Sequence, residues 1–492
     1  MKKQRPSRPV LALLCAQVLL AAGSATAQQV PPWPEPKPFV EPLRARSMPN
    51  FQAPSATHCA RPVSTREVPG LAEVPQQGRP WLRDELARAA PDVGVPERRS
   101  GGGAPAAAGA HTLPAPAASP APRLAAPAAP RESFAQHDAP PQLQRPSATV
   151  TAGVVDDNAD FSAYLAFRDR SSVEHRPRDI RERHLLEVKD RRGRAVGDAE
   201  VAVQGASGFV MWARTDTGGR AWLHPDAFDP LRSSHYEVAV RKDGRHGIGH
   251  LARGQKGAVE VTLDAAPPPA RARLDLVFLI DATGSMADEI DKLKATLRTI
   301  TAEVAALPSR PDICLGLVAY RDRGDAFLLR SHDFSNDVGA FLQQALLPLR
   351  AAGGGDYPEA MNEALHETVH QLSWRGDGTT RLVILLADAP PHLDYGAPHY
   401  DDDMVAALGK GIKLLGVGAS GLDQQGEFIQ RQMAQYTGGK FVFLTYADAH
   451  RPGSGPGRET VHDVKNYSVD TLDRLVVRLV TEELAKAGGR GS

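Results

Sequence analysis

The sequence predicts an α/β protein: a doubly wound, mostly parallel sheet, preceded by a small antiparallel β-sandwich and a disordered Pro/Ala-rich N-terminal region. Three observations carry this prediction. Between residues 273 and 447, apolar runs alternate with amphipathic helical patterns, which indicates strands buried on both faces. Between residues 183 and 265 the hydrophobic period changes to two. Of 41 prolines, 24 lie in residues 28–150, which offer little apolar surface to offset the entropy of ordering.

Residues 1–27 have the pattern of a signal peptide. Basic residues precede an apolar run over residues 10–22, and the small residues 25–27 (Ala-Thr-Ala) supply a cleavage site. The run is too short to cross about 30 Å of hydrocarbon. We therefore predict export through a cleaved signal, to the periplasm or to the outside or surface of the cell, with no membrane span in the mature chain. Residues 28–150 are predicted to be a disordered tether.

Charge and cysteine content exclude several classes of protein. Lys+Arg and Asp+Glu both number 58, so the net charge is zero. This balance argues against a nucleic-acid protein with a basic face and against an acidic solvating tail. Cys59 and Cys314 remain after signal cleavage. Cys314 lies in an apolar strand and is interpreted as a core residue, while a disulfide between the two cysteines is left open.

Residues 156–182 are predicted to form a helical linker. The Asp-x-Asn-x-Asp pattern at 156–160 resembles the start of a calcium loop. However, Phe161 and Phe167 occupy the places of the loop's glycine and final acid. The acids are therefore expected to cap a helix.

Residues 183–265 are predicted to be a β-sandwich, because short alternating strands are separated by Gly- and Asp-containing turns. The run at residues 215–221 resembles the carboxypeptidase-regulatory-like modules of the transthyretin type. That resemblance implies a spacer or packing module and no catalysis.

The α/β region carries its own element pattern. Strands are predicted at 274–280, 313–320, 382–387, 412–417 and 440–446, with a hairpin partner at 327–330 and helices at 287–307, 337–349, 358–374, 402–409 and 428–436. A C-terminal helix is predicted at 472–484, within the C-terminal segment 460–486, and its apolar stripe must pack on the sheet domain or on the sandwich. In parallel sheets, ligands bind beyond the carboxyl ends of the strands.

Oxygen-bearing side chains follow two of these strands. Asp281, Thr283 and Ser285 stand at alternate positions directly after the first strand, and Asp388 follows the strand at 382–387. These are hard oxygen ligands, which suit Mg²⁺, Mn²⁺ or Ca²⁺ better than zinc.

This Asp-x-Thr-x-Ser loop resembles the metal-ion-dependent adhesion site of von Willebrand factor type A domains. The resemblance covers residues 273–447, includes the strand order, and implies a Rossmann-like fold. It implies that the loop binds or orients a divalent cation, with Asp388 contacting that cation through water. The family usually places Thr in the middle loop. Here Gly355 falls near that place and Asp356 stands beside it, so Asp356 is the candidate middle ligand.

The family resemblance also implies a cofactor and a partner. The cofactor is a divalent cation, Mg²⁺ first, with Ca²⁺ or Mn²⁺ as alternatives. The partner is a protein that offers an Asp or Glu carboxylate to the metal. We therefore predict an exported, non-enzymatic binding protein. A structural envelope protein with a vestigial metal site is an alternative.

A second alternative is a zinc metallopeptidase. His366, Glu367 and His370 fit the H-E-x-x-H pattern, which places two imidazoles on one helix face. No Glu that could serve as third ligand occurs between 367 and 427, and the apolar stripe of the same helix already predicts a packing role. The nearby acids and histidines of residues 392–403 are interpreted as a solvated loop, with a role in narrowing specificity at the metal face as the alternative. The Arg-Gly-Asp at 323–325 is predicted only to turn the chain.

Overall fold

The computed structural model describes residues 51, 59–70, 149–206, 208–267, 269–355, 357–376 and 378–488. The predicted signal peptide, most of the predicted tether and the candidate ligand Asp356 lie outside these residues. No helix among the described residues combines the length and the apolar character needed to cross a membrane.

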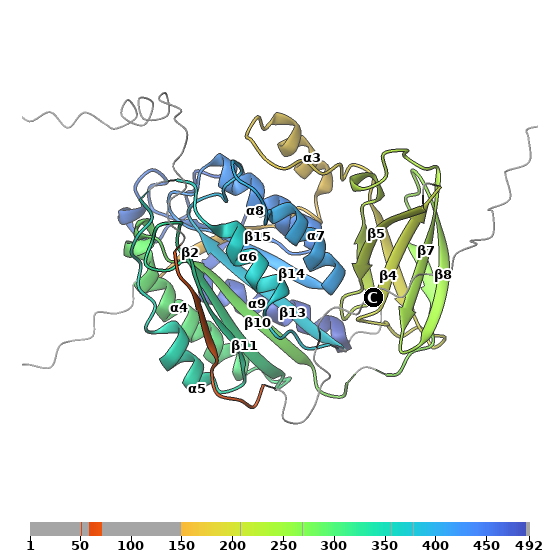
Figure 1. Cartoon of the computed structure of the whole chain (residues 1–492), viewed down its shortest axis with the longest axis horizontal. Coiled ribbons are helices and arrows are strands. Elements are labelled where there is room, and N and C mark those ends of the chain that lie inside the picture. Colours follow the sequence, from red (N-terminus) through yellow and green to blue (C-terminus); the bar gives the residue numbers. More distant parts are fainter. Residues whose placement is uncertain are drawn as a thin grey trace, which may run out of the picture. The chain divides into compact units, whose positions relative to one another are not determined.

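The described residues form a nine-stranded sheet at the centre of the α/β region (Figure 1). Its order is β1-β12-β11-β10-β13-β14-β15-β2-β16. The parallel strands are β10 (Arg273–Asp281), β11 (Asp312–Tyr320), β13 (Thr379–Ala387), β14 (Ile412–Gly418) and β15 (Phe441–Thr445). The predicted α/β fold is therefore confirmed, but the sheet is mixed within the described residues: its four central pairings are parallel and its four outer pairings are antiparallel. The parallel strands bring their carboxyl ends to one edge.

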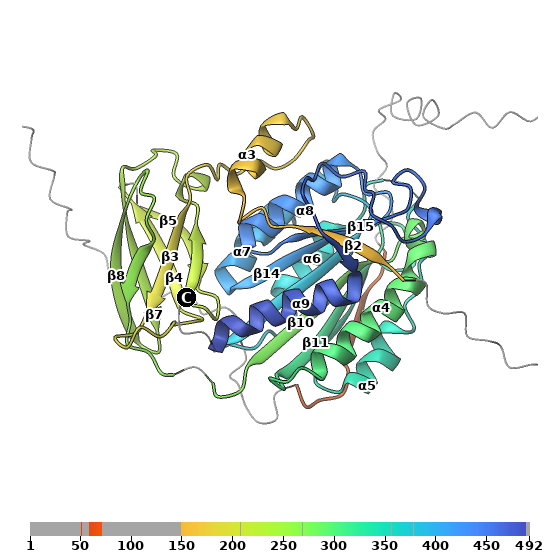
Figure 2. The same ribbon diagram turned by 180° about the vertical axis from the view of Figure 1, so that it is seen from behind.

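Helices cover both faces of this sheet. They are α4 (Ala287–Ala305), α5 (Val338–Phe341), α6 (Met361–His370), α7 (Tyr400–Lys410), α8 (Gln424–Thr437) and α9 (Leu472–Ala485). Helices α6, α7 and α8 lie in front in Figure 1, and α4, α5 and α9 lie in front in the reverse view of Figure 2. Alternate residues of β10 serve the two layers: Leu276 and Phe278 belong to the core under α4 and α9, and Val277 and Leu279 to the core under α6 and α8. Burial on both faces explains why the strand is apolar at consecutive positions.

Antiparallel strands extend both edges of the sheet. At one edge, β12 (Leu329–Ser335) pairs with β11 and overlaps the predicted hairpin partner at 327–330. Strand β1 (Thr65–Val68) then pairs with β12. At the other edge lie β2 (Thr151–Val155) and β16 (Val469–Thr471). The sheet therefore recruits strands from outside the predicted boundaries 273–447.

Strand β1 corrects the prediction that residues 28–150 are wholly a tether. Cys59 and Cys314 form a disulfide, which leaves both residues buried. Arg61 adds an ion pair of 3.0 Å with Asp333 of β12. A four-residue strand with little apolar surface is thus held by a covalent link and by the hydrogen bonds of an otherwise open sheet edge. Cys314 is accordingly a disulfide partner as well as a core residue.

The helix of the linker is shorter than the predicted linker segment, whereas the predicted C-terminal helix is confirmed. Within residues 156–182 the helix is α3 (Phe161–Arg170), and Asp160 caps it by accepting from the backbone N–H of Ala163 at 3.1 Å. This confirms the capping role of the acids. Helix α9 begins at Leu472 and ends at Ala485, close to the predicted 472–484, and its apolar stripe packs on the α/β sheet beside α4.

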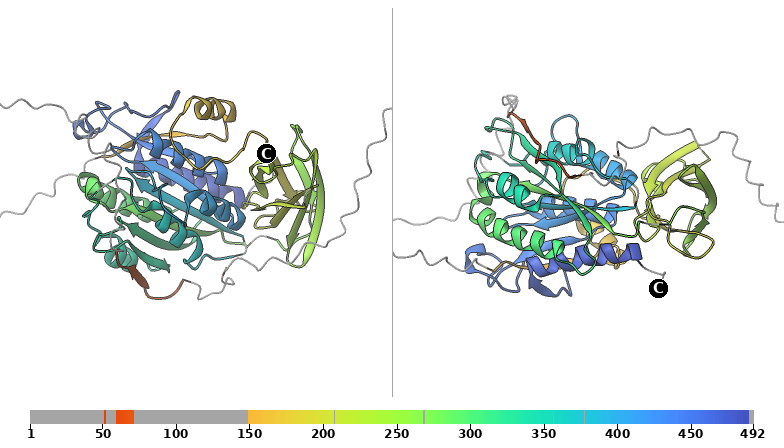
Figure 3. Two further views of the ribbon diagram at one scale, coloured as in Figure 1. Left: turned by 45° about the horizontal axis from the view of Figure 1, so that its top comes forward. Right: turned by 90° about the horizontal axis from the view of Figure 1, so that it is seen from below.

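A β-sandwich precedes the α/β domain in the chain. Its two sheets have the orders β6-β3-β9 and β5-β4-β7-β8 within the described residues, and Figure 3 shows them from two further directions. The strands are β3 (His184–Lys189), β4 (Glu200–Gly205), β5 (Gly208–Arg214), β6 (Arg220–Leu223), β7 (His235–Lys242), β8 (Arg245–Ala252) and β9 (Val259–Thr262).

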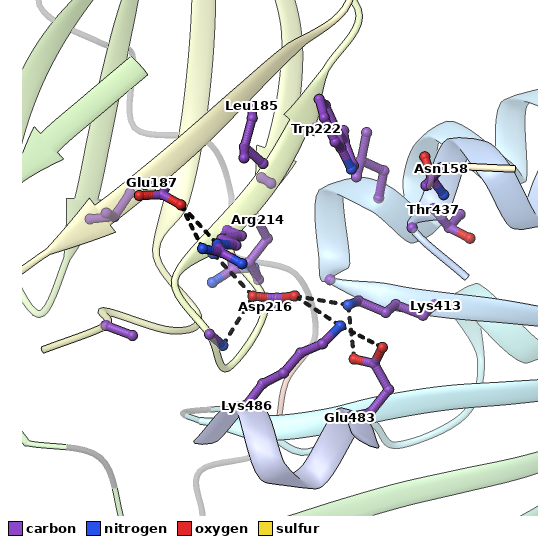
Figure 4. Close-up of a pocket in the computed structure, with 18 of the residues that line it drawn as sticks. Asn158, Leu185, Glu187, Arg214, Asp216, Trp222, Lys413, Thr437, Glu483 and Lys486 are labelled. Atoms are coloured by element: carbon purple, nitrogen blue, oxygen red, sulfur yellow. Dashed lines mark hydrogen bonds and ion pairs between the residues drawn. The ribbon is translucent and has the colours of Figure 1, made fainter. Parts of the chain in front are cut away.

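Buried and half-buried ion pairs link the sandwich to the α/β domain. Lys413 of β14 places its Nζ 2.8 Å from Asp216 of the sandwich and 2.8 Å from Glu483 of α9. Figure 4 shows these groups beside a cavity of ≈ 600 Å³. A second pair joins Arg381 of β13 to Asp198 at 3.0 Å. The sandwich therefore acts as a packing module.

The ordered β1 changes what limited proteolysis should release. We expect mild digestion to cut the Pro/Ala-rich parts of residues 28–150 first, because such composition leaves the backbone open to proteases. A peptide containing residues 59–70 should stay bound to the core and be released under denaturing conditions only after reduction, because of the Cys59–Cys314 disulfide. Mass spectrometry with and without reductant measures this, and Cys314→Ser should lose the linked peptide. Protection of the whole 28–150 region would contradict the prediction.

Candidate functional site

The loop after β10 gathers three oxygen-bearing side chains. The Asp281 Oδ1 accepts from the Thr283 backbone N–H at 3.0 Å and from its hydroxyl at 2.7 Å. The hydroxyls of Thr283 and Ser285 lie 3.1 Å apart. Asp281 and Thr283 are buried, whereas Ser285 is exposed. The loop thus holds the Asp281 carboxylate in the interior and the Ser285 hydroxyl at the surface. The three side chains lie close together, as their alternating positions predict.

The middle loop packs directly on the first. The Gly284 N–H donates to the Gly353 carbonyl at 2.9 Å. Gly354 has a φ of +70°, and a Cβ on it would lie 2.7 Å from the Thr283 Cβ. Only glycine fits both the backbone conformation and the close approach. Asp356 lies outside the described residues, so its place in the site remains a prediction.

The third loop brings Asp388 to the same place. Asp388 directly follows β13 and is 6 % exposed, and the Ser285 hydroxyl hydrogen-bonds to it. The Oδ2 of Asp281 and the Oδ1 of Asp388 are buried and have no hydrogen-bond partner among the described residues. Two buried carboxylate oxygens in want of a partner, together with two hydroxyls, fit the donor set of a hard divalent cation.

The electrostatics of the site follow from this crowding. Burial, and next the charge of Asp388, raise the pKa of Asp281 to about 7. Burial also raises the pKa of Asp388 and that of the neighbouring Glu289. A divalent cation beside these carboxylates would favour their charged forms and so lower these pKa values.

Sequence reasoning missed two carboxylates that support the middle loop. The Asp325 carboxylate accepts from the backbone N–H groups of Gly354, at 2.9 Å, and of Asp322, at 3.1 Å. The Arg-Gly-Asp segment is therefore part of the site's framework and does more than turn the chain. Glu359 is 3 % exposed, and its Oε1 would lie 2.8 Å from a Cβ on Gly354. The sequence feature that could have identified Asp325 as a site residue is its position after β11, a strand that ends at the same sheet edge as Asp281.

Proton competition should make metal binding depend on pH. The raised pKa of Asp281, about 7, means that a cation must displace a proton below neutral pH. We expect the apparent Mg²⁺ affinity to fall roughly tenfold from about pH 8 to about pH 6. Calorimetric titration at both values measures this, with circular dichroism as the control for folding. Equal affinities at both pH values would contradict it.

The H-E-x-x-H residues lie elsewhere, on α6. His366 and His370 both point to Asp403 of α7, whereas the Glu367 carboxylate accepts from the Ser331 hydroxyl at 2.7 Å and pairs with Arg66. Glu367 thus bonds to residues of β12 and β1 and does not face the two imidazoles. The arrangement that a zinc peptidase requires is not formed by these three residues.

The solvated-loop interpretation of residues 392–403 is wrong for several members. Asp401 and Asp403 are each 3 % exposed, and Asp401 pairs with Arg178 at 2.6 Å. His392 is also buried and lies 3.1 Å from Asp322. Helix α7 and its partners supplied the ion pairs that made this burial favourable, and a single-sequence pattern does not show them.

The fold and the acidic loop at the strand ends define a von Willebrand factor A domain. The family model described as "von Willebrand factor A domain" matches residues 275–391. The matched segment begins in β10 and includes the loops that carry Asp281 and Asp388. The chain therefore contains such a domain, with the sandwich and the added edge strands outside the matched segment.

Curated relatives and solved structures are similar to parts of the chain. "Alpha-protein kinase vwkA" of Dictyostelium discoideum is 30 % identical over 139 residues, which are 28 % of this chain and 22 % of that protein. "Putative ariadne-like RING finger protein R811" of Acanthamoeba polyphaga mimivirus is 30 % identical over 122 residues, 25 % of this chain and 12 % of that protein. The chain thus spans less than a quarter of these relatives.

Among solved structures, the pilus adhesin SpaC from Lactobacillus rhamnosus GG, in its open conformation, has 16 % identity and a TM-score of 0.26, covering 42 % of this chain and 31 % of that one. The conserved hypothetical protein BatB from Bacteroides thetaiotaomicron has 15 % identity and a TM-score of 0.30, covering 44 % and 100 %.

Proposed function

We propose that this chain is an exported, non-enzymatic binding protein that recognises a protein ligand through a divalent cation. The observation that carries the proposal is the meeting of Asp281, Thr283, Ser285 and Asp388 at one sheet edge, with two buried carboxylate oxygens in want of a partner. Mg²⁺ is the first candidate, and Ca²⁺ and Mn²⁺ are the alternatives. Asp356 is proposed as the middle ligand.

The exposed end of the proposed metal site is accessible to a partner's side chain. Asp281 and Thr283 lie buried at the bottom of the loop, while Ser285 is exposed beside Asp388. These donors need not complete the six or more positions that such cations take. A carboxylate of a partner's Asp or Glu would fill a remaining position, and its negative charge would be attracted to the cation. Binding then requires the cation and the partner's carboxylate together.

Export has independent support from the cysteines. Disulfides persist in oxidising compartments such as the periplasm and the cell exterior. The Cys59–Cys314 disulfide therefore agrees with the signal-peptide pattern of residues 1–27.

The test uses the purified chain as bait to capture proteins from the compartment to which it is exported. Capture in Mg²⁺ is compared with capture in EDTA. We expect the captured protein to be released by EDTA and to lose binding when its own contact carboxylate is changed to the amide. Capture that ignores both treatments would favour the structural envelope protein with a vestigial metal site. Release of cleaved peptides would favour the peptidase alternative. That alternative requires Glu367 to face the two imidazoles, whereas Glu367 accepts a hydrogen bond from Ser331.

A further inference from the structure

Helices α6 and α7 bring three metal-ligating side chains together away from the adhesion loop. The Nδ1 of His366 lies 3.1 Å from the Asp403 Oδ1, and the Nε2 of His370 lies 2.9 Å from the same oxygen. One ligand atom from each side chain falls within 4.8 Å of the other two. The imidazole centroids are 4.5 Å apart. Two nitrogens and one oxygen therefore converge on a small volume at the surface of the α6–α7 pair.

The carboxylate of this cluster is not satisfied by the two imidazoles. Asp403 is 3 % exposed, so water does not replace missing partners. Its Oδ2 is buried and has no hydrogen-bond partner among the described residues. A cation held by Asp403 and the imidazoles would compensate this buried charge.

The donor set selects the kind of cation. Imidazole nitrogens suit Zn²⁺, Cu²⁺ and Ni²⁺, whereas Mg²⁺ and Ca²⁺ prefer sites made of oxygen alone. A Zn²⁺ ion about 2.0–2.1 Å from each ligand sets neighbouring ligand atoms roughly 3.3 Å apart. The observed nitrogen–oxygen spacings of 2.9 and 3.1 Å are close to this value, and the two nitrogens lie within 4.8 Å of each other. The side chains of His366 and His370 are 45 % and 32 % exposed, which leaves an entry path and room for a further ligand such as water.

We propose that His366, His370 and Asp403 form a second metal site, which binds a transition-metal ion of the Zn²⁺ class and fastens α6 to α7. The site has no peptidase chemistry, because Glu367 is bound to Ser331 and Arg66 on the strand side of α6. Its role is to link two helices that flank the adhesion loops: α6 follows the loop with Gly354, and α7 follows the one with Asp388. The site does not depend on a cation at Asp281.

The test uses the untagged full chain, stripped of metal and titrated with Zn²⁺ in excess Mg²⁺. We expect one Zn²⁺ per chain in the wild type, with an increase in melting temperature. His370→Ala and Asp403→Asn should each lower the affinity at least tenfold (by about the factor seen when a metal site loses a supporting group). Co²⁺ in place of Zn²⁺ should give visible absorption bands that both variants lose.

Two controls make the result specific. His246→Ala with His250→Ala removes two exposed histidines of β8 and should leave Zn²⁺ binding unchanged. Asp281→Ala should also keep it, which separates this site from the proposed function. His366 and His370 are partly exposed, so their variants are expected to fold, and circular dichroism checks this. Absence of bound Zn²⁺, or equal Zn²⁺ affinity in wild type, His370→Ala and Asp403→Asn, would overturn the proposal.

Discussion

Asp281→Ala is expected to abolish metal-dependent partner capture while the domain stays folded. One oxygen of the buried Asp281 carboxylate accepts two hydrogen bonds from Thr283. The other oxygen has no hydrogen-bond partner among the described residues, and in our proposal it binds the cation. Without it, Asp388 remains in the site, but the loop loses its deepest negative charge. We expect Mg²⁺ affinity to fall at least 100-fold, about 3 kcal/mol, and partner binding to fall with it. Calorimetry measures the first loss, and capture in Mg²⁺ and in EDTA measures the second.

The stability of the same variant provides the control. The folded-state pKa of Asp281, about 7, lies above its ordinary value. Its protonated form therefore stabilises the metal-free fold at acid pH, and that stabilisation is lost as pH rises from about 4 to about 7. At about pH 8, Asp281→Ala removes a buried charge near Asp388 and should melt no lower than the metal-free wild type. Equal capture by both proteins with and without EDTA would eliminate the metal-bridge mechanism.

Arg375→Ala is expected to give the largest loss of stability, about 3–5 kcal/mol. The Arg375 side chain is 1 % exposed and pairs with Asp275 of β10 at 2.6 Å and with Asp312 of β11 at 2.8 Å. Asp275 is fully buried, and burial raises its pKa even with the arginine present. Removal of the guanidinium leaves that carboxylate without its cation inside the sheet domain. Denaturant unfolding measures the change.

Two comparisons test the cause of that loss. Arg298→Ala removes an exposed arginine of α4 and should change stability by less than about 0.5 kcal/mol. The double variant Asp275→Val with Arg375→Met removes the buried pair and should recover most of the stability, because no fully buried charge is left uncompensated, while the Asp312 side chain is 33 % exposed and reaches water. A double variant as unstable as Arg375→Ala would point to lost packing instead.

The meeting of the site's oxygen-bearing residues at one sheet edge was predictable, because the place of each residue depends only on the strand before it. Asp281, Thr283 and Ser285 follow one apolar strand at alternate positions, and Asp388 follows another strand that ends at the same edge. Parallel topology alone then brings the loops together. The buried Asp275 stood out only as a break in an apolar strand, since its partner Arg375 is 100 residues away.

Contacts between distant elements were the part that the sequence did not reveal. Asp403 completes the cluster with His366 and His370 through the packing of two helices, and hydrophobic periodicity does not specify which polar residues meet across them. Strand β1 was hidden for a different reason. Its four residues sit in Pro-rich surroundings, and their order comes from β12 and from the disulfide rather than from their own composition.

The placement of β1 and β2 has a consequence for how this domain can be divided. The two strands come from the same N-terminal part of the chain, yet they lie at opposite sides of the sheet, next to β12 and β15. A fragment limited to residues 275–391 would lack β14, β15 and both of these shields. Its bare strands would offer unpaired N–H and C=O groups as templates for self-association. The part of the chain that completes the sheet therefore extends beyond the family segment: β1 covers β12, β2 covers β15, and β1 and β16 form the edges.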